Sequence, residues 1–151
     1  IYYGSEIGMR GDKNKGGDAD IRKDFPGGWK GDSQNAFDPK TQTAEQKGFH
    51  DFTQKLLNWR KGKNVIHSGK TKHYMPKEKV YVYFRFNEKE NVMVIINNNE
   101  KDQTFDLGRF SESIQGITKG KDVISGKEFS ISSENKMTIS GKSSLILELQ
   151  K

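Results

Sequence analysis

The side chains that could do chemistry in this 151-residue chain are carboxylates, hydroxyls and three histidines, because the sequence contains no cysteine. Without cysteine there is no disulfide framework, no thiolate metal site and no thiol nucleophile. None of the histidines has a partner at the spacing of a metal site; they are His50, His67 and His73. The sequence therefore predicts no metal site, and carboxylates remain as the main groups for acid–base or binding chemistry.

The first 42 residues hold the other candidate groups. Asp12, Asp18 and Asp20 lack the spacing and the closing glutamate of a calcium loop. Two glycine pairs in this segment do not lie in the patterns that bind nucleotide phosphates. Because the segment is rich in turn-forming residues and almost without periodicity, we expect a long functional loop preceded by the end of a strand.

One helix is predicted after this loop. Thr43 and Gln46 have the spacing of a capping box, in which each side chain bonds the backbone N–H of the other residue. Apolar residues then follow at spacings of three, four and three, on one helix face: Phe49, Phe52, Leu56 and Trp59. The pattern predicts a helix from about Thr43 to Lys61 that stops at Gly62.

Beyond Gly62 the period of the apolar residues becomes two, which is typical of β-strands. Residues 79–86 and 92–96 are predicted to form a hairpin around a polar turn. The other expected strands are residues 65–68, 71–75, 103–107, 122–124, 128–132, 136–140 and 144–149. About eight short strands with regular turns predict a mainly β fold, an antiparallel β-sandwich with hairpin and Greek-key connections.

Composition and charge narrow the class of protein. The hydrophobic content is 31%, and 26 Lys and Arg stand against 20 Asp and Glu, for a net charge of +6. Because the basic residues are spread evenly among acids, we expect a solvated surface and no nucleic-acid partner. The longest apolar run, Val92–Ile96, is far shorter than the ~18 residues of a membrane span. Since the sequence starts at Ile1 rather than at methionine, we expect a fragment or a processed product.

Three motifs in the first 29 residues resemble the α-amylase family, glycoside hydrolase family 13. Ile1–Met9 (IYYGSEIGM) is similar to the eighth barrel strand of that family. In the loop behind it, Asp18, then Arg22 four residues later, then Trp29 follow the family's order. The segment Asp24–Trp29 (DFPGGW) is most similar to neopullulanases and starch-utilisation amylases of the Bacteroidetes type.

The later sequence agrees with this resemblance. Residues 52–60 are similar to the last barrel helix, and Val92–Asn97 is similar to an apolar strand that ends in Asn in the family's C-terminal β-domain. The resemblance implies that residues 1–64 are the end of a catalytic (β/α)8 barrel, with strand 8, its loop and helix 8. Residues 65–151 would form the C-terminal β-sandwich domain.

The implied parent enzyme is a hydrolase of α-glucans such as starch or maltooligosaccharides, with a retaining mechanism. In the family, the catalytic carboxylates come from barrel strands four, five and seven. All of these would precede Ile1, so we expect no catalytic residue here and no glycosidase activity from the fragment alone. Glu6 and Trp29 are implied to be structural.

Asp18 and Arg22 are the implied substrate-binding residues. The aspartate would accept hydrogen bonds from sugar hydroxyls and the arginine would donate through its planar fork. The sequence departs from the common pattern by an insertion at 12–17 and by the three residues between the pair. In another interpretation, Arg22 pairs with Asp18 or Asp20 and only orders the loop.

An alternative function is a non-catalytic carbohydrate-binding sandwich, in which tyrosine rings stack on sugars. The candidates are Tyr74, Tyr81 and Tyr83, but Tyr81 and Tyr83 share a strand face, and we favour cross-strand packing for them. A basic domain that binds nucleic acid ranks last, because no recognised motif is present.

The expected partner is an α-glucan oligosaccharide or polysaccharide, with no nucleic acid and no transmembrane segment. The exposed helix face is a candidate surface for self-association. No cofactor is expected in these residues, whereas calcium is a candidate for the missing part of the parent. The sequence does not fix the cellular location, although a periplasmic or cell-surface location suits the parent better than the cytoplasm.

Overall fold

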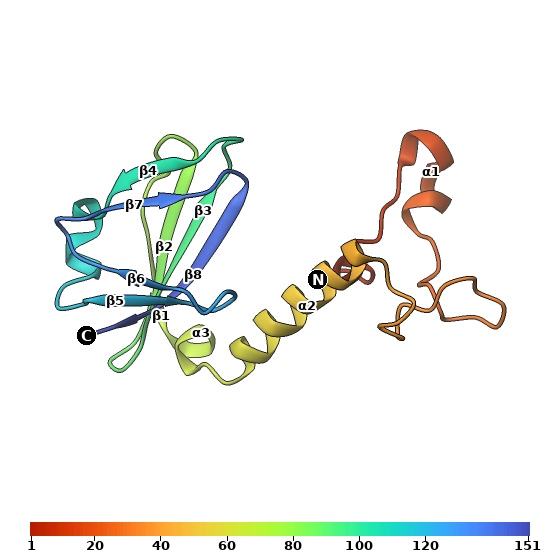
Figure 1. Ribbon diagram of the computed structural model, residues 1–151, viewed down its shortest axis with the longest axis horizontal. Helices are drawn as coiled ribbons and strands as arrows, with labels where there is room; N and C mark the ends of the chain where they lie inside the picture. Colours follow the sequence, from red (N-terminus) through yellow and green to blue (C-terminus); the bar gives the residue numbers. More distant parts are fainter. The chain divides into compact units, whose positions relative to one another are not determined.

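A computed structural model describes residues 1–151. The chain divides into two compact units, Ile1–Asn58 and Trp59–Lys151, called here the N-terminal and the C-terminal unit (Figure 1). The helical elements are η1 (Ser5–Ile7), α1 (Lys13–Ile21), α2 (Ala44–Lys61), α3 (Asn64–Ser68) and η2 (Leu107–Ser113). The strands are β1 (Lys70–His73), β2 (Val80–Phe86), β3 (Asn91–Asn97), β4 (Gln103–Asp106), β5 (Lys119–Asp122), β6 (Glu128–Ser130), β7 (Lys136–Ile139) and β8 (Ser143–Gln150).

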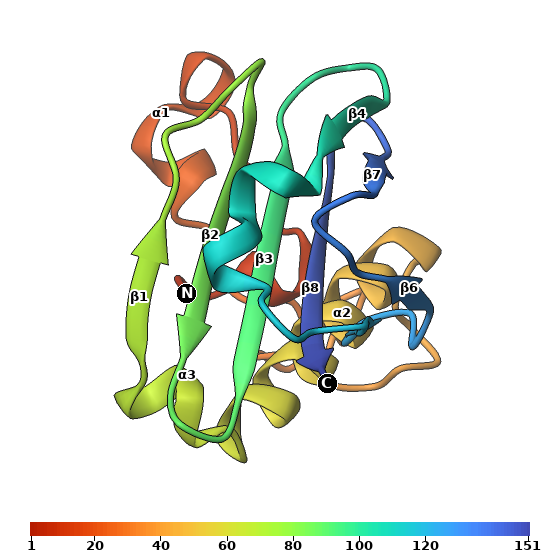
Figure 2. The ribbon, with the colours of Figure 1, turned by 90° about the vertical axis from the view of Figure 1, so that its left-hand side faces the viewer.

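The C-terminal unit consists of two antiparallel sheets. Six strands form the larger sheet in the order β1-β2-β3-β8-β5-β6, and β4 pairs with β7 in a second, smaller layer (Figure 2). The last strand of the chain, β8, lies in the middle of the large sheet between β3 and β5. This architecture confirms the predicted mainly β, antiparallel sandwich.

Alternation along β2 determines which side chains enter the core. Val80, Val82 and Phe84 are buried between the two sheets, whereas Tyr81 and Tyr83 lie half-buried on the outer face. The core of the C-terminal unit consists of Val80, Val82, Phe84, Met93, Ile95, Leu107, Phe110, Ile114, Ile131, Met137, Ile139, Leu147 and Leu149. Each fully buried side chain of this size contributes about 1.5–3 kcal/mol.

The outer face of the large sheet carries a second apolar cluster. Val65 of α3 packs with Val92 and Val94 of β3, and the partly buried rings of Trp59 and Tyr83 lie against them. Strand β3 is therefore covered on both faces over residues 92–95. A strand buried on both faces has a continuous apolar run instead of an alternating one, as this strand does.

Asn97 ends β3 at a buried position, with 2% of its surface exposed. Its Nδ2, which carries two hydrogens, lies 3.1, 3.3 and 2.9 Å from the backbone oxygens of Lys101, Ile139 and Ser140, so one N–H is shared between two of these acceptors. Its Oδ1 accepts from the backbone N–H and the side-chain amide of Asn99, at 2.9 and 2.8 Å. The side chain thus joins the end of β3 to the end of β7 and to the turn between β3 and β4.

Two predicted strands are wrong. Residues 65–68 lie in the short helix α3, because Val65 and Ile66 pack on the sheet and Ser68 Oγ donates to the Asn64 oxygen at 3.2 Å, one helical turn back. The second wrong prediction is the strand at residues 122–124: β5 ends at Asp122, and residues 123–126 form a turn. The Asp122 carboxylate holds this turn by accepting from the backbone N–H and the hydroxyl of Ser125, at 2.7 and 2.6 Å.

The N-terminal unit contains more helix than the sequence indicated. The segment expected to be a loop contains α1, which is N-capped by Asp12 through its bond from the Asn14 N–H and is interrupted at Gly17, where φ is 63°. No residue of α1 is buried, so the helix had no apolar stripe to reveal it. The predicted strand at the start of the chain is absent, because this unit has no other strand to pair with it.

The predicted helix after this segment is confirmed as α2. Thr43 N–H donates to Gln46 Oε1 at 2.9 Å, and Gln46 N–H donates to Thr43 Oγ1 at 3.2 Å, so the capping box forms in both directions. On the apolar face, Phe49 and Phe52 are 45% and 43% exposed, while Trp59 belongs to the C-terminal unit and packs on its outer cluster. The domain boundary predicted between residues 64 and 65 stays a prediction, as does self-association through this face.

Candidate functional site

The two predicted substrate-binding residues lie near each other at the end of α1, Asp18 in its last turns and Arg22 at its C-cap. Arg22 Nη2 is 4.0 Å from Asp18 Oδ2, and Lys13 Nζ is 3.3 Å from Asp18 Oδ1. Both side chains are exposed, by 68% for Arg22 and 58% for Asp18. The pair is therefore an exposed i, i+4 ion pair whose charged groups remain accessible to a ligand.

Arg22 does not pair with Asp20, the other partner that the sequence allowed. Asp20 Oδ1 is 2.7 Å from Lys23 Nζ, and its other oxygen accepts the backbone N–H of Asp12. The bond from Lys23 and then the Asp12 N–H hold the pKa of Asp20 below its usual range. Asp20, rather than Arg22, ties the two ends of the α1 segment together.

The residues implied to be structural occupy different settings. Glu6 lies half-buried in the short η1 turn. The Trp29 side chain is 67% exposed, and its loop is held by Asp32 Oδ2, which accepts the N–H groups of Gly27 and Trp29 at 2.7 and 3.1 Å. Structural roles for Glu6 and Trp29 stay predictions.

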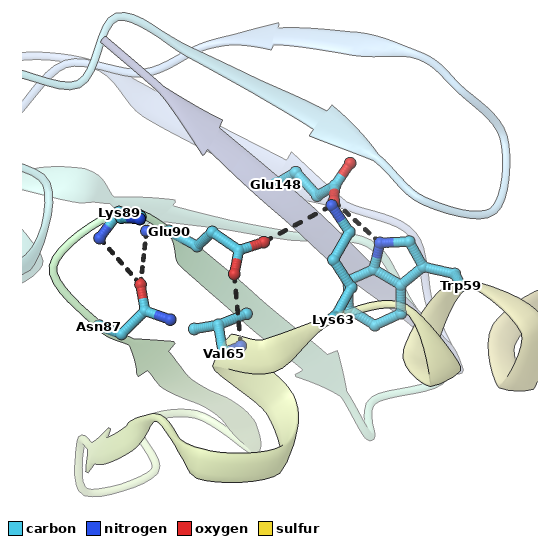
Figure 3. A network of polar contacts seen from close by, with 7 residues as sticks. All are labelled: Trp59, Lys63, Val65, Asn87, Lys89, Glu90 and Glu148. Atoms are coloured by element: carbon cyan, nitrogen blue, oxygen red, sulfur yellow. Dashed lines mark hydrogen bonds and ion pairs between the residues drawn. The ribbon is translucent and has the colours of Figure 1, made fainter.

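A polar network on the outer face of the C-terminal unit was not foreseen from the sequence (Figure 3). Glu148 Oε1 accepts the Trp59 indole N–H at 2.9 Å and lies 2.5 Å from Lys63 Nζ. Lys63 is also 3.7 Å from Glu90 Oε1, while Glu90 Oε2 accepts the Val65 N–H at 3.4 Å. The network joins the end of α2 and the start of α3 to β8 and to the β2–β3 hairpin.

The network changes the acidity of its members. Burial opposes ionisation of Glu148, but the hydrogen bonds from Lys63 and Trp59 outweigh it, so the pKa of Glu148 is lowered. The bond to Glu148 raises the pKa of Lys63, against the smaller effect of burial. The only sequence signal for this network is one charged residue inside the apolar run of β8.

Replacing Glu148 by glutamine is expected to destabilise the C-terminal unit at neutral pH, with a difference that shrinks in acid. Because the folded-state pKa lies below the ordinary value of 4.5, the ionised carboxylate contributes stability above that value. This contribution is lost as the pH falls through the folded-state pKa. Urea unfolding of the chain and the variant at several pH values between about 3 and 7 measures the difference.

Glu128→Gln is the matched control for that experiment. Glu128 lies 3.8 Å from Lys119 in an exposed pair, and such pairs contribute about 0–1 kcal/mol. The control should leave the unfolding midpoint nearly unchanged at every pH. A Glu148→Gln deficit of the same size at pH about 3 and 7 would contradict the proposed linkage.

The tyrosines considered for sugar stacking have separate surroundings. The Tyr74 ring packs edge-on against Phe84 and Phe110, with centroids 5.8 and 4.8 Å away, and its hydroxyl lies 2.8 Å from Ser113 Oγ. Tyr74 is thus partly buried and packs against the core. Tyr81 and Tyr83 lie on the outer face with ring centroids 5.6 Å apart, consistent with packing along one strand face.

A groove of about 590 Å³ opens in the C-terminal unit between β2, β4 and η2. It is lined by Lys77, Glu78, Val80, Val82, Gln103, Thr104, Phe105, Asp106, Arg109, Phe110 and Lys136. No group of three or more His, Cys, Asp or Glu side chains in the chain is arranged to hold a metal ion. No helix has the length and apolar character needed to span a membrane.

The fold of the C-terminal unit is that of the C-terminal β-sandwich domain of α-amylases. The family model described as the cyclo-malto-dextrinase C-terminal domain matches residues 71–148, more than half of the chain. The chain belongs to this family.

Solved structures show the same fold. The α-amylase from Geobacillus thermoleovorans, complexed with acarbose, matches 99% of the chain with a TM-score of 0.70 and 16% identity, over 29% of its own length. A variant of AmyP in complex with maltotriose matches 75% of the chain (TM-score 0.65, 16% identity, 23% of its length). An α-amylase from Anoxybacillus matches 68% (TM-score 0.57, 23% identity, 22% of its length). The chain therefore spans less than a third of each of these proteins.

Proposed function

We propose that this chain is the C-terminal part of an α-glucan hydrolase with a retaining mechanism. The observation that carries the proposal is the match of the cyclo-malto-dextrinase C-terminal domain to residues 71–148. The complexes of similar structures with acarbose and maltotriose support an oligosaccharide substrate. The resemblance of the first 29 residues to the end of a catalytic barrel supports a parent enzyme in which a barrel precedes the sandwich.

In this proposal, Asp18 and Arg22 position the substrate. At 4.0 Å from a single carboxylate oxygen, the Arg22 guanidinium retains most of its five N–H donors for a ligand. Asp18 offers acceptor oxygens to sugar hydroxyls, and hydrogen bonds of this kind are strengthened by the charge. Both side chains are exposed, so neither contributes to the packing of the N-terminal unit.

The chemical step itself belongs to the preceding barrel in this proposal. Retaining hydrolysis requires one carboxylate as nucleophile and a second carboxyl as acid, about 5–5.5 Å apart. We place both in barrel strands that precede Ile1. Calcium is a candidate ligand of that part of the parent enzyme.

The complete gene product and the 151-residue chain are to be compared on starch, pullulan and cyclodextrin. We expect the complete protein to hydrolyse at least one of these substrates. NMR recorded early in the reaction should show that the newly formed reducing end has the α configuration. The chain alone should give no turnover. Three results would contradict the proposal. The chain alone could hydrolyse a substrate and lose that activity in the Glu6→Gln variant, the complete protein could release a product of inverted configuration, or the complete protein could be inactive.

A further inference from the structure

The loop between α1 and α2 presents one large aromatic side chain that has no partner. Trp29 is 67% exposed, its indole N–H makes no hydrogen bond within the chain, and its ring is paired with no other ring or cation. Phe37 of the same loop is equally exposed, but its ring packs on Phe25, with centroids 5.0 Å apart. The two faces and the N–H of the Trp29 indole are therefore available to a ligand.

The backbone that carries Trp29 is closely held. The Asp32 carboxylate accepts the N–H groups of Gly27 and Trp29 at 2.7 and 3.1 Å, and the Trp29 oxygen accepts the Asp32 N–H at 3.3 Å. Further along the loop, the buried Ala36 donates its N–H to the Pro26 oxygen at 3.0 Å. Because the loop is folded on itself, little backbone entropy would be lost when a ligand binds to the exposed ring.

The sequence around Trp29 is not that of a buried interface. The other residues of the segment 27–32 are three glycines, a lysine and an aspartate. Interface cores are apolar and poor in charged residues, so a tryptophan that packs against another domain is accompanied by apolar neighbours. Phe49 and Phe52 on α2 form such a group, whereas Trp29 stands alone among polar residues. This setting suits a ligand that has both an apolar face and hydrogen-bonding groups.

A sugar ring is a ligand of this kind. Its C–H groups form an apolar face that packs on an aromatic ring, while its hydroxyls lie around the edge. The indole N–H of Trp29 and the ammonium of the adjacent Lys30, which forms no ion pair, are donors for such hydroxyls. Since Lys30 and Asp32 carry opposite charges, the segment has no net charge that would select an ion.

We propose that Trp29 binds substrate in the complete enzyme by stacking on a glucose ring of the α-glucan. The choice of an α-glucan among sugars rests on the proposed function. Trp29 would add an apolar contact to the hydrogen bonds of Asp18 and Arg22, which belong to the same unit. This role differs from the structural one that the family resemblance implies for Trp29.

The kinetic test compares Trp29→Ala and Trp29→Phe in the complete gene product, with maltoheptaose as substrate. Trp29→Ala should raise KM about tenfold with little change in kcat, and Trp29→Phe, which keeps an aromatic ring, should stay within about threefold of the unaltered protein. Neither variant should lower the thermal unfolding temperature, because the indole is exposed. The matched control is Phe37→Leu, which removes the other exposed ring but keeps an apolar contact with Phe25, and it should leave KM unchanged.

Binding is also measured without turnover. In the complete protein labelled with isotope on tryptophan, the Trp29 indole N–H signal is the one that is missing from the NMR spectrum of Trp29→Phe. This signal should shift when maltoheptaose is added and should not shift with the β-linked cellohexaose. The measurement does not require Trp29→Ala to fold.

An unchanged KM in a folded Trp29→Ala variant would overturn the inference, as would a Trp29 signal that does not shift at millimolar maltoheptaose. A lower unfolding temperature with an unchanged KM would assign Trp29 the structural role instead. Hydrolysis by the complete protein without an effect at Trp29 overturns this inference alone. A shift of the Trp29 signal without hydrolysis overturns only the proposed function.

Discussion

Replacing Asn97 by alanine is expected to lower the free energy of unfolding of the C-terminal unit by about 3–5 kcal/mol. The amide has five hydrogen-bonding partners, three around its Nδ2 and two that donate to its Oδ1, at a position that is 2% exposed. Its removal would leave carbonyl oxygens at the end of β7 and in the β3–β4 turn, and the N–H groups of Asn99, without this partner. Each buried polar group that loses its partner costs about 1–3 kcal/mol.

The loss is measured by urea unfolding, with the transition followed by circular dichroism. Asn97→Asp keeps the shape of the side chain but turns an oxygen toward three carbonyl oxygens, so it should be about as damaging. The matched control is Asn98→Ala, its exposed neighbour, which should change the free energy by less than about 0.5 kcal/mol. A loss below about 1 kcal/mol for Asn97→Ala would show that water replaces the amide.

In the complete enzyme, Asp18→Ala is expected to lower kcat/KM for maltooligosaccharides about 10- to 100-fold, mainly through KM. A hydrogen bond to a charged group contributes about 1.5–3 kcal/mol, which corresponds to this range. The fold should be unaffected, because the exposed Asp18–Arg22 pair contributes only about 0.3–0.5 kcal/mol. Initial rates against oligosaccharides of increasing length, together with thermal unfolding, measure both effects.

Asp51→Ala is the control for Asp18→Ala. Lys47 and Asp51 form an exposed i, i+4 pair on α2, at 2.7 Å, which matches the Asp18–Arg22 pair in spacing and exposure. The control should leave both KM and stability unchanged. If Asp18→Ala also leaves KM unchanged, the pair only orders its segment, as the other interpretation of the sequence holds.

Local patterns predicted the elements whose periodicity reflects one buried face. The alternation in residues 80–86 predicted β2 and its inward side chains, and the Thr43–Gln46 spacing predicted the start of α2. A strand was predicted where α3 lies, because a run of four residues with two β-branched side chains is too short to show a helical period. The α1 helix was missed because it buries nothing.

The candidate sites divide in the same way. The Asp18–Arg22 ion pair matches one of the two interpretations drawn from the sequence, although the helix that carries Asp18 was missed. The groove could not be predicted, because its lining comes from residues 77–82, 103–110 and 136, and only the pairing of distant strands brings these together. The Trp59–Lys63–Glu148 network likewise joins residues that are 89 positions apart.

The ends of the large sheet determine how copies of this chain can meet. Its edge strands are β1, with four residues that include Lys70 and Lys72, and β6, with three. Short and charged edges are poor templates for backbone pairing with another chain. Growth of fibrils by adding strands to the edges of the large sheet is therefore disfavoured in the folded protein.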